Sequence, residues 1–449
     1  MKYEFIFLRT NYLMSDIKYI ENGAGIGAYC YYTDRFKSEN ISVYLTLPTS
    51  REDSVKRSLF LSVLKRGTKS LPTQKEINIK LDELYATLVS LKNQKFDDTQ
   101  LLGISADIID SAYTECGEDL MPEVLNLLAE ILYSPKKDGE TGRFCEEFVK
   151  SEKENYKSII LSQINEPRTY AAIRCREEMF AELGIFDKLD TMCEKIDGAT
   201  ADEIYEVYTD AVENAGILAF YVGKRSPEEV MAQLEGAFSP KGHKKCKEAT
   251  STIPSLASRC TPKEVIESAD VTQGRLVMGF NSGITWRDED YYATLLCNEI
   301  LGASPISKLM VNVREKLSLC YECSSVYNSA RGAIIVTTGI DTENYELARG
   351  AIEAQLDDIK NGSVSEQELL AAKKSIYNIY NAVSDSPNAI ERFYLGRIIN
   401  GIDASVSDFL EKIEALSLDD VVNAAKKLEL HTVYFLKGER QGEGESDEI

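Results

Sequence analysis

The sequence predicts an α+β protein with two tandem homologous domains, each a mixed β-sheet with helices packed on one face. Its 449 residues are more than one hydrophobic core usually serves. Apolar residues make up 43% of the chain and charged residues 28%, as in ordinary globular proteins. The same order of predicted strands and helices occurs twice, which indicates a duplicated domain rather than a solenoid.

The first copy begins with short strands and turns and continues with clearer signals. Residues 41–47 are β-branched and aromatic, which favours a strand. In residues 52–66 apolar side chains recur at helical spacing. The same criteria predict further helices at 73–88, 121–132, 144–163, 170–183 and 201–214, and strands at 88–91, 101–109 and 217–222.

The second copy follows a segment rich in Lys, Ser, Thr and Pro. Residues 239–262 have no sustained period, so they are the predicted linker between an N-terminal domain (1–238) and a C-terminal domain (263–449). Strands are predicted at 271–280, 320–327, 333–340 and 432–436, and helices at 288–301, 306–317, 345–361, 365–383, 388–400 and 418–428.

Composition restricts the partners and the compartment. The net charge of −22 argues against nucleic acid or an anionic membrane as a partner. No uncharged run is long enough for a membrane span, and the N-terminal apolar run is too short for a signal peptide. The ten cysteines are scattered, as is typical of reduced thiols. We therefore expect a cytoplasmic protein.

The most specific chemistry lies in residues 314–327, which read REKLSLCYECSSVY. Arg314 ends a charged helix, and Tyr321 opens a strand-like run after a short apolar turn. By themselves, these residues also permit a plain interpretation. The arginine would pair with a neighbouring acid, and the tyrosine would be one core-edge residue among the 24 tyrosines of the chain.

The same stretch contains a Cys-x-x-Cys sequence at Cys320 and Cys323. A redox or zinc role requires both sulfur atoms on one side. Residues three apart in a regular strand point to opposite faces of the sheet. We therefore expect these cysteines to be structural.

Histidine is scarce. His243 lies in a Lys-rich stretch, and His431 precedes a terminal strand. We expect both at the surface or at a strand end rather than as ligands. A mechanism that needs two histidines at helical spacing is excluded within this chain.

Nearly the whole chain resembles the M16 metallopeptidases (pitrilysin or insulinase-like, mitochondrial processing peptidase-like). The resemblance rests on the duplicated halves, on Leu-Lys-Arg-Gly-Thr at 64–68 and on the Arg-Glu-Lys-Leu-x-Leu-x-Tyr motif, and is strongest over 291–341. It implies the LuxS/MPP-like metallohydrolase fold. The Tyr85-Ala86 pair and the missing metal site look most like the bacterial YfmF-type subgroup.

Active members of this family carry an inverted zinc motif, His-x-x-Glu-His, on the helix before Gly-Thr. The two histidines bind Zn²⁺, and the glutamate activates the metal-bound water. In this chain the aligned positions are Ser58, Leu61 and Ser62, and a later ligand position falls near residues 158–159. The resemblance thus implies a degenerate site, with no metal or other cofactor in this chain.

The resemblance also assigns roles to Arg314 and Tyr321. In the family, this pair reaches from the second domain toward a zinc site, and in short-chain heterodimers one subunit supplies the zinc and the other the pair. The arginine can orient a carbonyl or carboxylate of the substrate, and the tyrosine can donate a hydrogen bond to the oxyanion. Both would be catalytic residues contributed in trans to a partner.

The resemblance thus implies a non-catalytic subunit of an M16-type zinc peptidase pair, inactive alone. Its partner would be a zinc-bearing homologue, with zinc in that subunit, and its substrate an extended peptide. A homodimer is the other possible assembly. Two alternatives stay open. One is a peptide-binding or scaffold module with no role in catalysis, and the other is a stand-alone hydrolase with a different mechanism.

Overall fold

The computed structural model describes residues 16–23, 25–96, 98–238, 256–257, 259, 261–402 and 404–439. Its internal contacts define two compact units. Unit 1 contains Met1–Ile159, Leu189–Thr252 and Ala382–Ser405. Unit 2 contains Ile160–Lys188, Ile253–Asn381 and Val406–Ile449. Most of the predicted linker, and His243 within it, lies outside the described residues.

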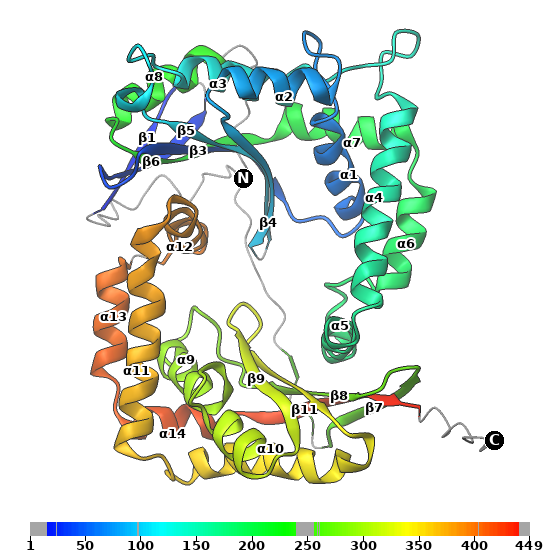
Figure 1. Ribbon diagram of the computed structural model, residues 1–449, viewed down its shortest axis with the longest axis vertical. Helices are drawn as coiled ribbons and strands as arrows, with labels where there is room; N and C mark the ends of the chain where they lie inside the picture. The colour runs from blue at the N-terminus through cyan, green and yellow to red at the C-terminus, as the bar shows by residue number, and fades with distance from the viewer. Residues whose placement is uncertain are drawn as a thin grey trace, which may run out of the picture. The chain divides into compact units, whose positions relative to one another are not determined.

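Unit 1 is built on a six-stranded mixed sheet with the order β1-β2-β6-β3-β5-β4 (Figure 1). Only β2 and β6 are parallel neighbours, and the other neighbouring strands are antiparallel. The central strands β3 and β6 are buried along almost their whole length, whereas β4 is an edge strand with alternating exposure. The strands are β1 (Ile17–Glu21), β2 (Ile26–Tyr32), β3 (Ser38–Pro48), β4 (Leu88–Phe96), β5 (Thr99–Ile109) and β6 (Gly216–Gly223).

Unit 2 is built on a five-stranded mixed sheet with the order β7-β11-β8-β10-β9. Here β7 and β11 are the parallel neighbours. Without β1, the first sheet has the same strand order, so the topology confirms the duplication predicted from the sequence. The strands are β7 (Lys263–Ala269), β8 (Gly274–Asn281), β9 (Cys320–Asn328), β10 (Ala333–Ile340) and β11 (Glu429–Gly438).

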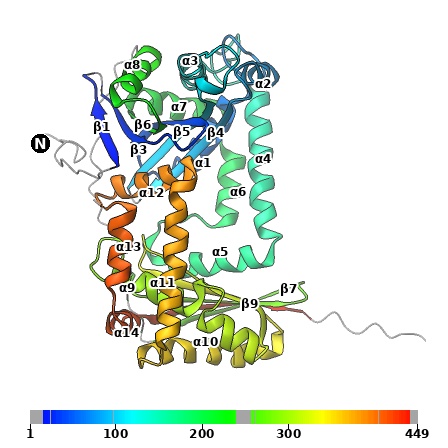
Figure 2. The same cartoon turned by 60° about the vertical axis from the view of Figure 1, so that its left-hand side comes forward.

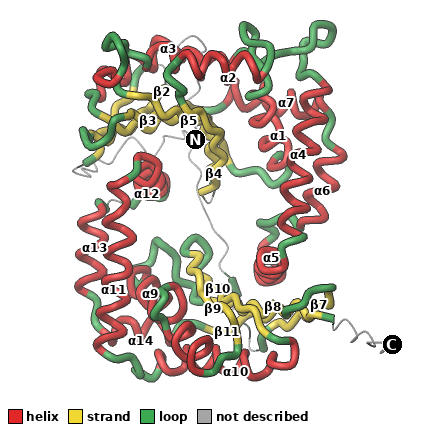
Figure 3. The backbone as a smooth tube through the Cα atoms, viewed as in Figure 1, coloured by secondary structure: helices red, strands yellow, loops and turns green. Residues whose placement is uncertain are grey.

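Each unit combines its sheet with helices, as the backbone trace in Figure 3 shows. The first half of the chain contains α1 (Ser54–Leu64), α2 (Gln74–Glu83), α3 (Met121–Tyr133), α4 (Glu146–Ile164), α5 (Pro167–Met179), α6 (Leu189–Gly198), α7 (Ala201–Asn214) and α8 (Pro227–Phe238). The second half contains α9 (Tyr291–Asn298), α10 (Tyr345–Lys360), α11 (Glu366–Asn381), α12 (Pro387–Ile399), α13 (Val406–Ala415) and α14 (Leu418–Lys426). Two wider π-helical segments, η5 (Glu299–Ala303) and η6 (Leu309–Lys316), stand where regular α-helix is predicted.

Each unit also contains one helix from the other half of the sequence. In unit 2, α5 buries Ala171, Cys175 and Met179 against a cluster that includes Val277 and Tyr434. In unit 1, α12 lies on the face of the first sheet away from α3 and α8, and α5 likewise lies on the face of the second sheet away from α10 (Figures 1 and 2). These two exchanged helices, α5 and α12, cover the second face of each sheet. The sequence predicts helices on one face only, so this part of the prediction is incomplete.

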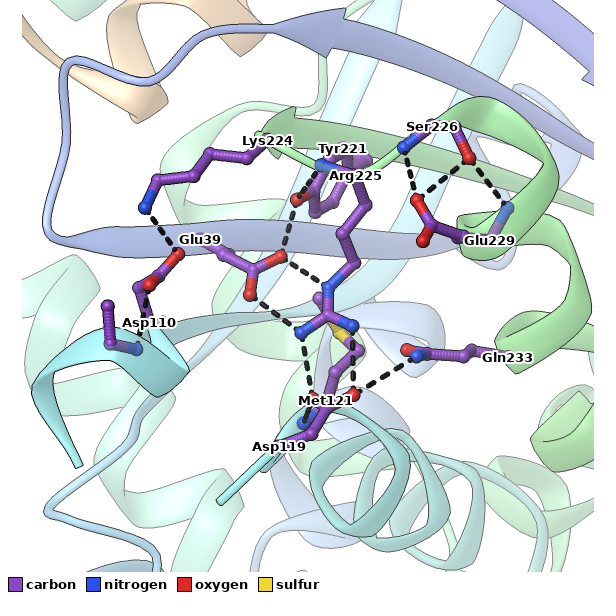
Figure 4. Close-up of polar contacts among 11 residues, drawn as sticks. Glu39, Asp110, Asp119, Met121, Tyr221, Lys224, Arg225, Ser226, Glu229 and Gln233 are labelled. Carbon is purple, nitrogen blue, oxygen red and sulfur yellow. Dashed lines mark hydrogen bonds and ion pairs between the residues drawn. The ribbon is translucent and has the colours of Figure 1, made fainter. Parts of the chain in front are cut away.

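An ion-pair network, buried at its Glu39 end, joins β3, the end of β6 and the segment before α3 (Figure 4). The Arg225 guanidinium donates to both Glu39 carboxylate oxygens, at 2.6 and 2.8 Å, and to both Asp119 oxygens, at 2.9 and 2.7 Å. Tyr221 donates a further short hydrogen bond to Glu39. Burial would raise the pKa of Asp119, but hydrogen bonds from Arg225 and the Met121 amide outweigh it, and the pKa is lowered. This network holds three sequence-distant segments together.

The predicted elements are confirmed in type, apart from the two π-helical segments. Within the described residues, and apart from short 3-10 helices, one strand and three α-helices are additional. These are the strand β7 and the helices α6, α8 and α13. Among the described helices, none combines the length and apolar character needed to cross a bilayer.

Candidate functional site

The three positions aligned with the zinc motif lie on α1 and hold neither a group that suits Zn²⁺ nor a general base. Leu61 is a buried core residue. The Ser58 hydroxyl donates to the Ser54 carbonyl oxygen and accepts from the Asn93 side-chain amide, both at 3.1 Å. The Ser62 hydroxyl donates to the Ser58 carbonyl oxygen at 3.2 Å. Neutral hydroxyls bonded to their own helix cannot replace two imidazoles as zinc ligands.

A polar pocket of about 310 Å³ lies beside Ser62. Its lining includes Lys65 and Arg66 from α1 and Glu152 and Asn155 from α4. Arg66 forms a short ion pair with Glu152, so the one carboxylate near Ser62 is already neutralised. Burial lowers the pKa of Lys65, whose ammonium donates to the Val89 carbonyl oxygen at 3.3 Å. Two cations in the pocket oppose binding of a divalent metal ion, so this region does not fit a zinc site.

The expected position of the later ligand, near residues 158–159, does not line this pocket. Residues 158–159 are exposed on α4, whereas Glu152 and Asn155 are the α4 residues that line the pocket with Ser62. Among the residues that the structure describes, no three His, Cys, Asp or Glu side chains are grouped so that they could hold a metal ion.

Arg314 lies in the π-helical segment η6 of unit 2 and is exposed. Its guanidinium contacts the Met310 sulfur at 3.4 Å, and within the described ranges no acidic side chain forms an ion pair with it. The interpretation that Arg314 forms a salt bridge with a neighbouring acid is therefore wrong for the described part of the chain. The cation remains available to an outside carboxylate or carbonyl group.

Tyr321 is 77% exposed, although it lies within β9 at the edge of the second sheet. The pairing of β9 with β10 explains this exposure. Ile340 pairs with Cys320 and Gly339 pairs with Glu322, so Tyr321 is an extra residue in a β-bulge. A bulge redirects the side chain of its extra residue. The interpretation of Tyr321 as a core-edge residue is wrong, because the bulge directs the phenol to solvent.

The turn before β9 brings Arg314 and Tyr321 into one region of unit 2. The Ser318 amide donates to the Arg314 carbonyl oxygen at 3.1 Å, and the Leu319 amide donates to the Val313 carbonyl oxygen at 3.2 Å. Ser318 has a left-handed backbone with φ of 51°, which is unusual for a residue other than glycine. The charge of Arg314 also reaches Cys320, where it lowers the thiol pKa. The structure thus holds the two predicted residues at the ends of one tight connection.

The bulge also overturns the expectation for Cys320 and Cys323. Because Tyr321 is an extra residue, the alternation of side chains restarts after it. The side chains of Cys320 and Cys323 therefore lie on the same face of β9. Both cysteines are buried, and each thiol is close enough to shift the pKa of the other. The sequence alone could not reveal this arrangement, since a bulge has no sharp sequence signal here.

His431 is buried at the start of β11 rather than at the surface. Its Nε2 accepts a hydrogen bond from Arg259 Nε at 3.1 Å, and its Nδ1 lies 2.8 Å from the Thr432 hydroxyl. Burial, reinforced by the charge of Arg259, lowers the pKa of His431. The neutral imidazole therefore serves the packing of unit 2.

Comparison with known proteins agrees with this account. A family profile described as "Peptidase M16 inactive domain" matches residues 198–376. The "Probable inactive metalloprotease YmfF" of Bacillus subtilis strain 168 is 31% identical over 417 residues, which cover 92% of this chain and 96% of that protein.

Solved structures show the same fold. A conserved protein from Enterococcus faecalis V583 superposes with a TM-score of 0.85 at 25% identity, covering 95% of this chain and all of the other. A peptidase M16 inactive domain from Pseudomonas fluorescens superposes with a TM-score of 0.75 at 17% identity, covering 95% of this chain and 99% of the other.

The duplicated α+β units and the substituted ligand positions define a homologue of a metallopeptidase that lacks the metal-binding residues. The chain belongs to the peptidase M16 family, as one of its inactive-type members. The predicted fold and family are thus confirmed.

Proposed function

We propose that this chain is the non-catalytic subunit of an M16-type zinc peptidase pair. It supplies Arg314 and Tyr321 to the active site of a zinc-bearing homologue that processes peptides. The observation that carries the proposal is the exposure of Tyr321 on its bulge, beside an arginine without an acidic partner in the described chain. Exposed, unpaired polar groups on a rigid element are suited to act on a ligand or partner.

The phenol of Tyr321 has the properties of an oxyanion donor. A tyrosine hydroxyl carries one proton that it can donate in a hydrogen bond. The edge strand β9 fixes the direction of the side chain through its pairing with β10. A donor held in place before the reaction stabilises the developing negative charge without a cost of reorganisation.

Arg314 supplies a second and different contact. Its planar guanidinium can donate two parallel hydrogen bonds to a carboxylate or bridge to a peptide carbonyl group. On this proposal Arg314 orients the peptide and Tyr321 stabilises its transition state. Zinc belongs to the partner subunit, where it would activate the attacking water.

The proposed pair is a heterodimer in the cytoplasm. All eight cysteines that the structure describes are free thiols, which supports a reducing compartment such as the cytoplasm. The C-terminal domain, residues 263–449, carries both contributed residues, while the N-terminal domain, residues 1–238, keeps the degenerate site. A heterodimer with a zinc-bearing homologue is the proposed assembly.

Reconstitution tests the proposal. We expect peptide hydrolysis when the chain is co-expressed with a zinc-bearing M16 homologue, and none from this chain alone. Arg314→Ala should reduce kcat/KM of the pair by roughly 10- to 100-fold, the loss of about 1.5–3 kcal/mol expected for a hydrogen bond to a charged group. Lys316→Ala is the matched control, because Lys316 is an exposed cation of the same segment bonded only to Asn312 among its described partners.

Other results would support the alternatives. If the homologue alone is as active as the pair, and Arg314→Ala behaves like Lys316→Ala, the chain is a scaffold or peptide-binding module. Hydrolysis by this chain alone that persists in the presence of chelators would indicate a stand-alone hydrolase. Each of these results contradicts the proposal.

A further inference from the structure

The paired thiols of Cys320 and Cys323 are a feature that the proposed function does not use. The β-bulge at Tyr321 places both side chains on one face of β9, and each thiol shifts the pKa of the other, so the two side chains are neighbours. Other buried cysteines, such as Cys175 and Cys297, have no such neighbour among the described cysteines. Two neighbouring thiols on one face of a strand can form a disulfide after a small rearrangement. A buried thiol with no cysteine nearby has no partner for such a bond.

The surroundings favour the thiolate form of Cys320. The neighbouring Cys323 thiol lowers the pKa of Cys320, and the Thr338 hydroxyl and the charge of Arg314 act in the same direction, against burial and Glu322. The neighbouring Cys320 thiol and burial raise the pKa of Cys323. This asymmetry separates an attacking thiolate from a resolving thiol, since the thiolate is the nucleophile in disulfide exchange.

Cys320 is also close to solvent. It is the first residue of β9, a strand bonded to a neighbour on one side only, and it is 9% exposed against 2% for Cys323. The preceding residues 314–318 are exposed, and Ser318 holds a strained left-handed backbone. Because Cys320 lies at the first position of an edge strand, next to these exposed residues, a small oxidant can reach it without unfolding of the unit.

We propose that Cys320 and Cys323 form a reversible disulfide, which makes the strand that carries Tyr321 a site of thiol–disulfide modification by low-molecular-weight disulfides. The Cys320 thiolate attacks one sulfur of the small disulfide, forms a mixed disulfide and releases one small thiolate. Cys323 then loses its proton to solvent and attacks the Cys320 sulfur, and the second small thiolate leaves. The two cysteines lose two electrons in total, and the small disulfide is reduced to two thiols.

The disulfide would act directly on Tyr321, because Tyr321 lies between the two cysteines. A disulfide requires a Cα–Cα separation of about 4.4–6.8 Å, so the bond would fix the two ends of the bulge within that range. The direction of the phenol therefore differs between the reduced and oxidised chains. This consequence rests on the proposed function, whereas disulfide formation itself does not.

Peptide mapping of the chain alone provides the test. The full-length native protein is equilibrated in glutathione buffers with an increasing oxidised fraction, quenched with acid, alkylated and digested with trypsin. Cleavage after Lys316 and Arg331 releases a peptide whose only cysteines are Cys320 and Cys323. We expect this peptide to become lighter by two hydrogen atoms than its unalkylated reduced form, while Cys175 and Cys297 remain alkylated. Dithiothreitol should reverse the change.

Two substitutions test the order of the steps. Cys323→Ser should accumulate glutathione on Cys320, because no resolving thiol remains. Cys320→Ser should leave Cys323 largely unmodified in the same buffer. Exposed Cys116 is the internal measure of general thiol oxidation.

Some results would overturn the proposal. One is a wild-type peptide alkylated at both cysteines when Cys116 is fully converted to its glutathione adduct. The other is a stable glutathione adduct on wild-type Cys320, which would show that Cys323 does not resolve it. Because the wild-type chain is measured without a partner, these results are independent of whether the pair hydrolyses peptides.

Discussion

Two arginines of this chain show how environment decides the role of one residue type. Arg225 is held by two carboxylates in unit 1, where the buried Glu39 receives two of its hydrogen bonds. Arg314 is exposed and forms no ion pair within the described part of unit 2. The first arginine is suited to stability and the second to recognition, although the sequence alone does not separate them.

This difference predicts the effect of substitution at Arg225. Arg225→Ala leaves the carboxylate of Glu39 buried with the Tyr221 hydroxyl as its remaining strong partner. We expect the free energy of unfolding to fall by about 3–5 kcal/mol, as for the loss of one member of a buried ion pair. Urea unfolding followed by circular dichroism measures this change.

Arg143→Ala is the control for Arg225→Ala. Its acidic partners, Asp202 and Glu206, have mostly exposed side chains. Its effect should be below about 1 kcal/mol, because solvent screens exposed pairs. Equal effects of the two substitutions would show that the network of Figure 4 contributes no special stability.

At the residue scale, the loss of motif residues can be read directly from the sequence. The directions in which side chains point could not be predicted from it. The replacement of the zinc-motif residues at Ser58, Leu61 and Ser62 is visible in the sequence, because it concerns residue identity alone. The exposure of Tyr321 and the contact of the two cysteines depend on one extra residue in a strand pairing. A one-residue change of register reverses every face assignment, so a periodic pattern fails at a bulge.

At the scale of elements, the exchanged helices are the least expected feature. α5 and α12 occupy equivalent places in the two halves, and each packs in the unit formed mainly by the other half. In α12, the buried Glu391 accepts a 2.6 Å hydrogen bond from the Tyr44 hydroxyl on β3. Helical period identifies the helices, but it does not identify the sheet against which each one packs.

The Tyr44–Glu391 contact predicts a stability effect. Tyr44→Phe removes the donor and leaves a buried carboxylate with Lys92, at 3.5 Å, as its remaining partner among the described residues. We expect a loss of about 1–3 kcal/mol in the free energy of unfolding. Tyr32→Phe, at an exposed position of β2, should change it by less than about 0.5 kcal/mol. A Tyr44→Phe protein as stable as the control would show that this contact does not anchor α12.

Some elements that were not predicted had usable signals. α8 begins with Pro227 after Ser226, whose hydroxyl and amide both bond to Glu229 in a capping-box arrangement. The strand β7 was harder to predict, because it is an edge strand with charged residues next to the predicted linker. The π-helical widening of η5 and η6 has no known sequence signal that residue propensity supplies.

At the scale of the whole molecule, the duplication creates two units with different roles. Both have the same strand order apart from β1, and each has an edge strand at the same place, β4 in unit 1 and β9 in unit 2. Unit 1 keeps the scaffold of a metal site with the ligands replaced, and unit 2 keeps an exposed arginine and tyrosine. The fold and family could be predicted because pattern and motif extend over most of the chain, whereas the partner belongs to another sequence.

The central claim is that Tyr321 acts in the active site of a partner, and kcat of the reconstituted pair tests it most directly. Tyr321→Phe removes one hydroxyl and should lower kcat by about 10²–10³-fold, the usual cost of losing one oxyanion donor, with little change in KM. Tyr377→Phe, at another exposed tyrosine of unit 2, should leave kcat unchanged. If the Tyr321→Phe pair has the same kcat as the Tyr377→Phe pair, then Tyr321 makes no contribution to catalysis and the account is contradicted.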